Sequence, residues 1–187
     1  MQINITYDSS VTSANFLGGA TEETAFKNAI QYVVGLYEAL FTTNVTLNIT
    51  VGYGTVLGQT LSPGSTSQNF PGTITQVSYS TLLSQVSSLS SDSDLSAAEQ
   101  SAYATLPTLS QFDSLYTSDT LFLTNAEEKA LGLLAPNATT FDGAVVFGTP
   151  SQLGGATWDY STSTSATACR SPRLRSESPS ARARVRP

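Results

Sequence analysis

The N-terminal third of the chain shows, in turn, the periodicity of a strand, of a helix and of a second strand. Polar and apolar residues alternate from Gln2 to Asp8, which is typical of a half-buried strand. From Thr21 to Phe41 apolar residues recur every three or four positions, which predicts an amphipathic helix with Thr21 as its N-cap. Alternation returns from Val45 to Tyr53. We therefore expect a βαβ unit with two parallel neighbouring strands and a helix that covers one face of the sheet. The side chains expected to be buried are Ile5, Phe26, Ile30, Val33, Tyr37, Leu47, Ile49 and Val51.

The middle of the chain adds further strand and helix patterns. A short segment over 55–61 is followed by a loop-like stretch over 62–72 that is rich in Ser, Gly and Pro. Short strands are predicted at 73–77 and 143–147, with an apolar run at 121–123. Helices are predicted over 79–89, over 97–106 after a Ser96–Glu99 capping box, and over 126–134 after an Asn125–Glu128 capping box. Together these patterns predict an α+β or α/β fold built on a twisted mixed sheet.

Charge divides the chain into two pieces. All six Arg residues lie in the last 18 positions, whereas residues 1–169 hold two Lys residues as their only cations. With 13 acidic residues, residues 1–169 carry a net charge of −11, and the remainder carries +5. We therefore expect one domain over 1–160. The tail over 161–187, first Ser/Thr-rich and then Arg/Pro/Ser-rich, is expected to be disordered.

The composition also limits the chemistry. The chain has no His and a single Cys, Cys169, which excludes a His-ligated zinc, a His-based catalytic group, a Cys-built zinc cage and an internal disulfide. No apolar run is long enough to span a membrane, and the N-terminus lacks the pattern of a secretory signal. The acidic body, poor in Lys and Arg, suits an extracellular protein, or a need for solubility in any compartment.

Several acidic and glycine patterns invite a chemical interpretation, and each has a simpler structural one. Asp92, Asp94 and Glu99 resemble part of a calcium loop, but its Gly and its twelve-residue spacing are missing, so a solvated helix start is favoured. Gly52-Tyr53-Gly54 lacks the third Gly and the helix of a phosphate-binding turn, which favours a strand end. Glu22 and Glu23 are interpreted as complements of the helix dipole.

The remaining candidates concern catalytic bases and sugar attachment. Without His, a Ser nucleophile would need a Lys base, but Lys27 and Lys129 are both predicted to lie on helix surfaces. The Asn-x-Thr triplets that include Asn4 and Asn48 fall inside predicted strands and are interpreted as strand polarity. We therefore predict no catalytic and no metal-ligating residues in this chain, and the sequence does not define a substrate-binding set.

Four segments of the body carry a resemblance to a known family: Ile3–Asp8, Phe41–Gly54, Thr124–Leu134 and Phe141–Gly143. Together they resemble a family of bacterial metzincin-like zinc metalloproteases, over residues 1 to about 160. The resemblance implies an N-terminal subdomain of twisted sheet and helices, zinc as cofactor and polypeptide as substrate. In that family a helix with His-Glu-x-x-His supplies two zinc ligands and a general base, directly after the equivalent of 158–165. No residue of this chain matches that motif.

The resemblance stops around 166–169, and the tail that follows has no apolar periodicity. Its Arg, Ser, Pro and Ala content is what a GC-rich gene gives when it is read in the wrong frame, so we favour a frameshift or a truncation. A native basic tail that contacts nucleic acid or anionic lipid is one alternative, and a tail without a partner is the other. The neighbouring Arg residues should make the Cys169 thiol reactive, and we expect dimers through it in air.

Two hypotheses for function follow. In the first, the chain is an inactive, truncated piece of a secreted zinc endopeptidase, without zinc or peptidase activity of its own. In the second, it is a noncatalytic extracellular binding module on the same scaffold. Neither involves a membrane, and only the Arg-rich tail could contact nucleic acid.

Overall fold

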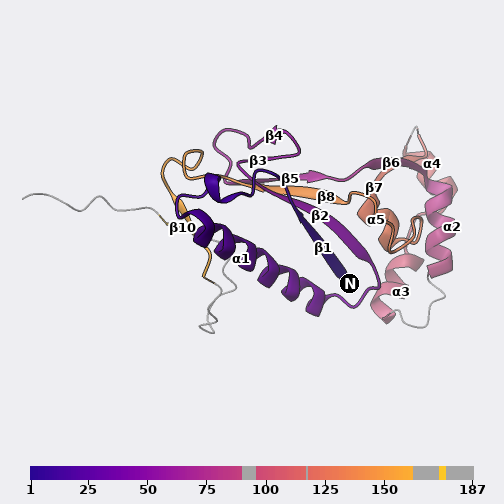
Figure 1. Ribbon diagram of the computed structural model, residues 1–187. Helices are drawn as coiled ribbons and strands as arrows, with labels where there is room; N and C mark the ends of the chain where they lie inside the picture. Colours follow the sequence, from indigo (N-terminus) through magenta and orange to yellow (C-terminus); the bar gives the residue numbers. More distant parts are fainter. Residues whose placement is uncertain (90–95, 117, 162–172, 176–187) are drawn as a thin grey trace, which may run out of the picture. The chain divides into compact units, whose positions relative to one another are not determined.

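The computed structural model describes residues 1–89, 96–116, 118–161 and 173–175, without the side chains of Glu99 and of 173–175. It is a mixed α+β protein (Figure 1). In chain order its elements are β1 (Gln2–Tyr7), a 3-10 turn (Ser13–Asn15), α1 (Gly19–Leu40), β2 (Thr46–Tyr53), β3 (Thr55–Val56), β4 (Gln59–Thr60), β5 (Ser67–Pro71), β6 (Ile74–Ser78), α2 (Tyr79–Leu89), α3 (Ala97–Ala104), α4 (Leu109–Leu115), β7 (Thr120–Thr124), α5 (Asn125–Ala130), β8 (Gly143–Phe147), β9 (Thr157–Asp159) and β10 (Arg173–Arg175).

The main sheet is mixed, with the strand order β4-β3-β2-β8-β5 and with β1 on β2. Gln2 N–H donates to Val45 O and Asp8 N–H to Val51 O, so β1 and β2 run parallel. The bonds Asp142 N–H to Asn48 O and Gly54 N–H to Phe147 O make β2 and β8 parallel as well. The bonds Gly72 N–H to Asp142 O and Gly148 N–H to Thr66 O make β5 antiparallel to β8. The predicted parallel βαβ unit is therefore confirmed.

Contacts between residues divide the chain into two compact units. The first contains Met1–Thr6, Tyr37–Ile49 and Phe70–Ala144, and the second contains Tyr7–Leu36, Thr50–Asn69 and Val145–Pro187. Strands β1, β2, β5 and β8 and helix α1 each have residues in both units.

An aromatic cluster forms the core of the second unit. Phe26 of α1 lies 5.7 Å from Tyr53 of β2 and 5.6 Å from Phe147 of β8, measured between ring centroids. Phe16 stacks on Tyr53 at 4.1 Å, and Trp158 of β9 meets Phe147 edge-on at 5.7 Å. Aromatic pairs at such separations each add about 0.5–1.5 kcal/mol beyond the burial of their area. The helix therefore packs on the sheet through Phe26.

The side of α1 that is buried differs from the prediction. Phe26 and Val34 are buried and Ile30 is partly buried, so the inner line of the helix follows steps of four residues. Val33 and Tyr37 were predicted to be buried but are 40% and 50% exposed, so that part of the prediction was wrong. In the strands, Val51 is buried and Ile5, Leu47 and Ile49 are partly buried.

The start of α1 also differs from the prediction. The helix begins at Gly19, so Thr21 lies inside the first turn and is not the N-cap. Gly18 N–H instead donates to Glu22 Oε2 at 2.7 Å, which satisfies one free donor at the helix start. Glu22 therefore has the helix-start role that its charge indicated.

The described residues of the first unit form a second, antiparallel sheet and the helices α2, α3, α4 and α5. β6 pairs with β7, with Ile74 opposite Thr124 and Ser78 opposite Thr120. Helix α2 has the predicted bounds, whereas α3 ends two residues earlier than predicted. Helix α4 was not predicted, although a Thr108–Gln111 capping box begins it. Its buried Phe112 stacks on Tyr79 of α2 at 3.9 Å, so tertiary packing stabilises a helix that is too short to form alone.

Two loop assignments also need correction. The stretch 62–72 contains strand β5, which pairs with β8 despite its Gly and Pro content because Pro71 lies at the end of an edge strand. In the expected disordered tail, Arg173–Arg175 form β10 and pair antiparallel with β9. The rest of that tail lies outside the described residues, so its disorder stays a prediction.

The hairpin between β3 and β4 contains a strained residue. Leu57 has a φ of +50° and Gly58 a φ of +76°, which is the conformation of a type I′ turn. Leu57 N–H donates to Asp8 Oδ2 at 3.0 Å. Partial burial raises the pKa of Asp8, but backbone hydrogen bonds from Ser10 and Leu57 outweigh it and leave that pKa below its usual value.

Replacement of Leu57 by Asn should stabilise the protein by about 0.5–1 kcal/mol, because Asn accepts positive φ at little cost. The Leu57 side chain is 53% exposed, so little buried area is lost. The urea midpoint should rise with an unchanged slope. Leu57→Ala keeps the Cβ atom and serves as the control. A urea midpoint for Leu57→Asn that is equal to or lower than that of the unchanged protein would contradict the strain argument.

Candidate functional site

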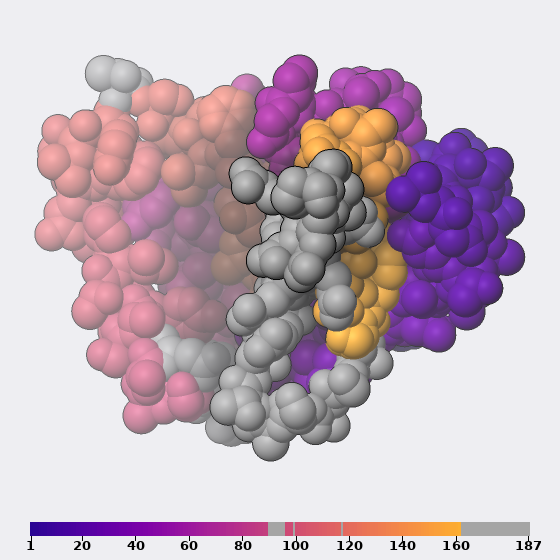
Figure 2. All heavy atoms as spheres, turned by 90° about the vertical axis from the view of Figure 1, so that its left-hand side faces the viewer, coloured from indigo at the N-terminus to yellow at the C-terminus, as the bar shows by residue number. Residues whose placement is uncertain are grey.

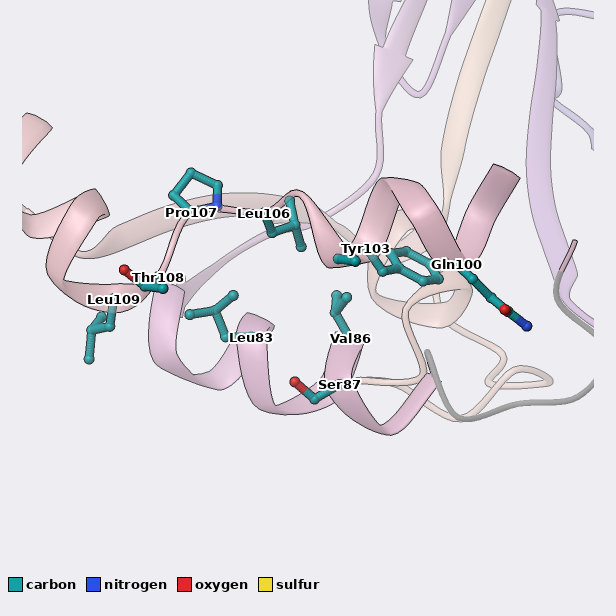
Figure 3. Close-up of a pocket in the computed structure, with 10 residues that line it drawn as sticks. Leu83, Val86, Ser87, Gln100, Tyr103, Leu106, Pro107, Thr108 and Leu109 are labelled. Atoms are coloured by element: carbon teal, nitrogen blue, oxygen red, sulfur yellow. The ribbon is translucent and has the colours of Figure 1, made fainter. Parts of the chain in front are cut away.

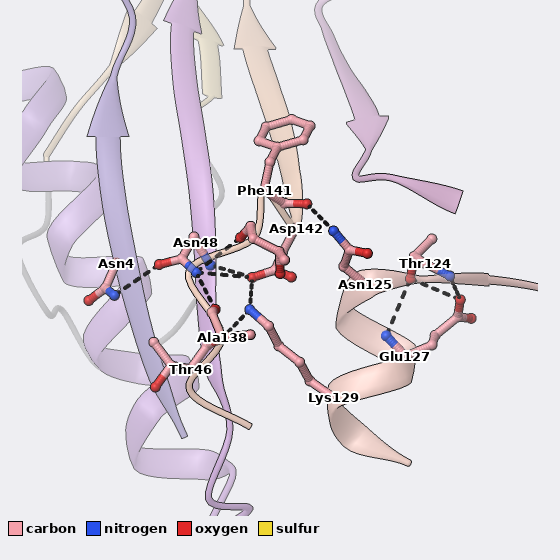
Figure 4. Close-up of polar contacts among 11 residues, drawn as sticks. Asn4, Thr46, Asn48, Thr124, Asn125, Glu127, Lys129, Ala138, Phe141 and Asp142 are labelled. Carbon is pink, nitrogen blue, oxygen red and sulfur yellow. Dashed lines mark hydrogen bonds and ion pairs between the residues drawn. The ribbon is translucent and has the colours of Figure 1, made fainter. Parts of the chain in front are cut away.

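The first unit contains a buried ion pair that the sequence did not reveal. Lys129 Nζ of α5 lies 2.5 Å from Asp142 Oδ2, and both side chains are inaccessible to solvent (Figure 4). Lys129 was predicted to lie on a helix surface, and that prediction was wrong. Lys27 does lie near the surface, where it pairs with Glu23 at 2.6 Å.

Helix α5 positions the lysine. Thr124 accepts from Glu127 N–H, and Glu127 accepts from Thr124 N–H, so the capping box begins one residue earlier than the predicted Asn125–Glu128 pair. This shift frees the Asn125 side chain, which is buried and donates to Phe141 O at 2.9 Å. This bond fixes the start of α5 to the chain segment that carries Asp142. Lys129 follows Asn125 by one helical turn.

Strand β2 completes the cluster. Asn48 N–H donates to Asp142 Oδ2 at 2.7 Å, and Asn48 Nδ2 donates to Ala138 O and Thr140 O at 3.1 Å each. Lys129 Nζ also donates to Thr46 O at 3.0 Å. The interpretation of Asn48 as mere strand polarity was therefore incomplete, because its amide ties β2 to the segment before β8. We call Thr46, Asn48, Lys129 and Asp142 the polar cluster.

The polar cluster is built for structure. Its charges are fully buried, so no substrate in solvent reaches Lys129 Nζ, which already donates to two oxygens. Two buried oxygens, Asp142 Oδ1 and Thr140 Oγ1, have no hydrogen-bond partner among the described residues. An unpaired buried oxygen costs free energy, which the donors on Asp142 Oδ2 offset: Lys129 Nζ, Asn48 N–H and, at 3.5 Å, Asn48 Nδ2. A buried ion pair of this kind ties elements together more than it adds net stability.

Zinc does not fit the groups that this chain offers. Zinc sites in proteins use His nitrogen, Cys sulfur and carboxylate oxygen in a tetrahedral set. The chain has no His, and its one Cys lies outside the described residues. Within the part of the chain that the structure describes, no three His, Cys, Asp or Glu side chains lie close enough together to hold a metal ion. The absence of zinc stays a prediction.

Two tyrosines contact Phe26 in the aromatic cluster, with ring centroids 5.7 Å away for Tyr53 and 5.8 Å away for Tyr160. The hydroxyls of Tyr53 and Tyr160 are both buried without a partner among the described residues. Burial raises the pKa of Tyr53, and burial together with the nearby Tyr53 raises the pKa of Tyr160 strongly. Both phenols therefore stay protonated at neutral pH and have no acid-base role there.

A pocket of about 550 Å³ lies between α2, α3 and the start of α4 (Figure 3). Leu83 and Val86 line it from α2, and Tyr103 lines it from α3. None of its lining residues is charged. The Thr108 hydroxyl in this lining is engaged in the capping box of α4. The lining residues therefore offer neither a charged group nor the Thr108 hydroxyl for selecting a ligand.

Helix α1 leaves apolar side chains in solvent. The exposed fractions are 42% for Tyr32, 45% for Leu36 and 73% for Leu40. With Val33 they form what we call the outer stripe of α1. Figure 2 shows the indigo N-terminal part of the chain at the surface. Exposed apolar side chains gathered on one element are typical of a contact surface.

The other residues singled out from the sequence fall into two groups. Gly52 and Tyr53 end strand β2, as interpreted, and a Cβ atom on Gly52 would come within 2.1 Å of Thr55 O. Asp92, Asp94 and Cys169 lie outside the described residues, as does the Glu99 side chain. The calcium-loop alternative, the Ser96–Glu99 capping box and the reactivity of Cys169 stay untested.

Comparison with models of protein families, with curated proteins and with solved structures gives no match. The class that the structure defines is thus a mixed α+β protein, and the resemblance to metalloproteases depends on the four segments quoted above. Among the described helices, none combines the length and the apolar character needed to cross a membrane.

Replacement of Lys129 by Met should destabilise the protein by about 3–5 kcal/mol, because it leaves Asp142 charged and buried. The double variant Lys129→Met/Asp142→Asn should recover part of that loss, since Asn still accepts from Asn48 N–H. Urea unfolding of both single variants and the double variant measures this coupling. Lys27→Met is the matched control and should cost about 0.5 kcal/mol or less, because its partner Glu23 is one helical turn away and the pair keeps access to solvent. Equal losses for Lys27→Met and Lys129→Met would refute the structural role of the cluster.

Proposed function

We propose that the chain is a catalytically inactive relative of the metzincin-like zinc endopeptidases, and that it acts through contact with polypeptide. One observation carries the proposal. The four segments that resemble the family fall on β1, β2, α5 and the start of β8, and three of them supply the polar cluster. The fourth reaches it through Asn4 Nδ2, which donates to Asn48 Oδ1 at 3.0 Å. The resemblance therefore follows the residues that build a scaffold.

The chemistry of the chain supports the inactive part of the proposal. Peptide hydrolysis by a zinc enzyme needs a metal-bound water and a general base beside it. The chain has no His to hold such a metal, and Lys129, the one buried cation among the described residues, is fixed by Asp142. No hydrolytic step is therefore assigned to this chain.

The outer stripe of α1 supports the polypeptide part. A helix that is apolar over much of its circumference is normally covered on more than one side. The sheet covers the line through Phe26 and Val34, whereas Tyr32, Leu36 and Leu40 remain exposed. Apolar and aromatic side chains of this kind are the usual anchors of protein contacts. We propose an extracellular location, since the body is acidic and poor in Lys and Arg.

The second candidate is a self-contained extracellular binding module on the same scaffold. The hydrogen bonds of the polar cluster, and the aromatic core in which Trp158 Nε1–H donates to Gly148 O, favour it. The exposed outer stripe favours the first candidate, because a self-contained domain has less reason to leave Leu40 at 73% exposure.

The purified chain should contain far less than one zinc per molecule after dialysis against a weak chelator, and should not hydrolyse casein with or without added zinc. The physical reason is the missing His donor set. Elemental analysis and a casein assay make the measurement, with Cys169→Ser as the control for metal held by the thiol. One tightly bound zinc per chain, or zinc-dependent hydrolysis, would overturn the proposed function.

A further inference from the structure

The outer stripe of α1 has a defined place on the helix. Successive residues of an α-helix are turned by about 100°, so Tyr32, Leu36 and Leu40 form one line along the axis. Phe26, Ile30 and Val34 form a second line, which faces the core. Ala25 and Ala29 extend the outer stripe toward the start of the helix, and both are partly buried.

No charge projects from the outer stripe. Glu22 turns back to Gly18 N–H, and Glu23 pairs with Lys27. Glu38 accepts from Ile3 N–H at 2.7 Å. The charged residues of α1 are Glu22, Glu23, Lys27 and Glu38, and each has one of these partners. The outer stripe from Ala25 to Leu40 is therefore neutral in a chain of net charge −6. A neutral, apolar stripe favours a neutral, apolar occupant over a charged ligand.

The side chains of the stripe differ in size along its length. The small residues Ala25 and Ala29 lie in the first half of α1, and the large residues Tyr32, Val33, Leu36 and Leu40 lie in the second half. If two such helices pair antiparallel about an axis between residues 32 and 33, Leu36 of one faces Ala29 of the other, and Leu40 faces Ala25. Large side chains then meet small ones toward both ends of the pair, whereas Tyr32 of one copy faces Val33 of the other at the centre.

We propose that the occupant of the outer stripe is a second copy of this chain, bound through an antiparallel α1–α1 pair with two-fold symmetry. An isologous interface needs a patch that is complementary to itself, and the size gradient along α1 supplies one. Antiparallel pairing also sets the two helix dipoles in opposite directions. The inference deepens the proposed function, because it names the polypeptide that the same stripe binds.

The expected association is weak and depends on salt. A helix of 22 residues is roughly 33 Å long, and one side of it covers only part of the ~800 Å² per partner of a standard interface. The net charge of −6 on each copy opposes association at low ionic strength. Dimers should therefore appear at high protein concentration and increase when salt is added.

Sedimentation velocity under reducing conditions, over a range of protein concentrations, tests the proposal with two matched variants. Leu36→Glu places a charge in the stripe and should weaken dimerisation at least about tenfold, because a tenfold change needs only 1.4 kcal/mol and an unpaired buried charge costs more. Gln31→Glu places the same charge on an exposed position of the same helix, away from the stripe, and should leave dimerisation unchanged. Both positions are exposed, so both variants should fold.

A cysteine cross-link tests the register. In a Cys169→Ser background, Val33→Cys lies next to the proposed axis and should form an intermolecular disulfide in air, whereas Gln31→Cys should not. A chain that stays monomeric at all concentrations and salt levels, or equal cross-linking of the two variants, would overturn the α1–α1 pair. Loss of the pair would leave the zinc and casein results as they are, so its failure is distinguishable from failure of the proposed function.

Discussion

The interaction on which the scaffold depends is the buried pair of Lys129 and Asp142. Two opposite charges without access to solvent are costly unless each is paired and hydrogen-bonded, which restricts where the chain around them can lie. Lys129 reaches Thr46 O of β2, and Asp142 receives the backbone and the side chain of Asn48. Helix α5, strand β2 and the start of β8 are therefore held in one arrangement, because any other would leave a buried charge without its partner.

The burial of these groups limits the chemistry that the described residues can perform. The one buried cation of the described residues serves packing, and the phenols of Tyr53 and Tyr160 are held in their protonated state by burial. Several large apolar side chains that the core does not use lie along the second half of α1, among them Tyr32, Leu36 and Leu40. In the described part of the molecule the charges of the polar cluster and the two phenols are thus enclosed, whereas apolar side chains of α1 remain in solvent.

The sequence predicted the elements with strong periodicity and missed those that depend on distant partners. The alternation of β1 and β2 and the long apolar stripe of α1 were sufficient for a parallel βαβ unit. Strand β5 and helix α4 could not be predicted, because β5 exists through its pairing with β8 and α4 through the stacking of Phe112 on Tyr79.

The buried residues show the same limit. The apolar residues of α1 cover a wide part of its circumference, which led to the prediction that Val33 and Tyr37 are buried. The sheet covers only the line of Phe26, Ile30 and Val34. Helical periodicity places Lys129 on a face of α5 without telling which segment covers that face. In the sequence, Lys129 is followed by the apolar residues Ala130 and Leu131, which is a weak sign of burial. That sign became specific only with Asp142 beside the lysine in the structure.

Hydrogen exchange at the backbone amide of Asn48 tests most directly whether the polar cluster holds the scaffold together. This amide donates to Asp142 Oδ2 at 2.7 Å, so we expect it to exchange only through global unfolding, with a protection that matches the free energy of unfolding. In Lys129→Met the same amide should lose protection by the full destabilisation of that variant. Exchange of the Asn48 amide through local opening, at a rate typical of exposed loops, would contradict the account.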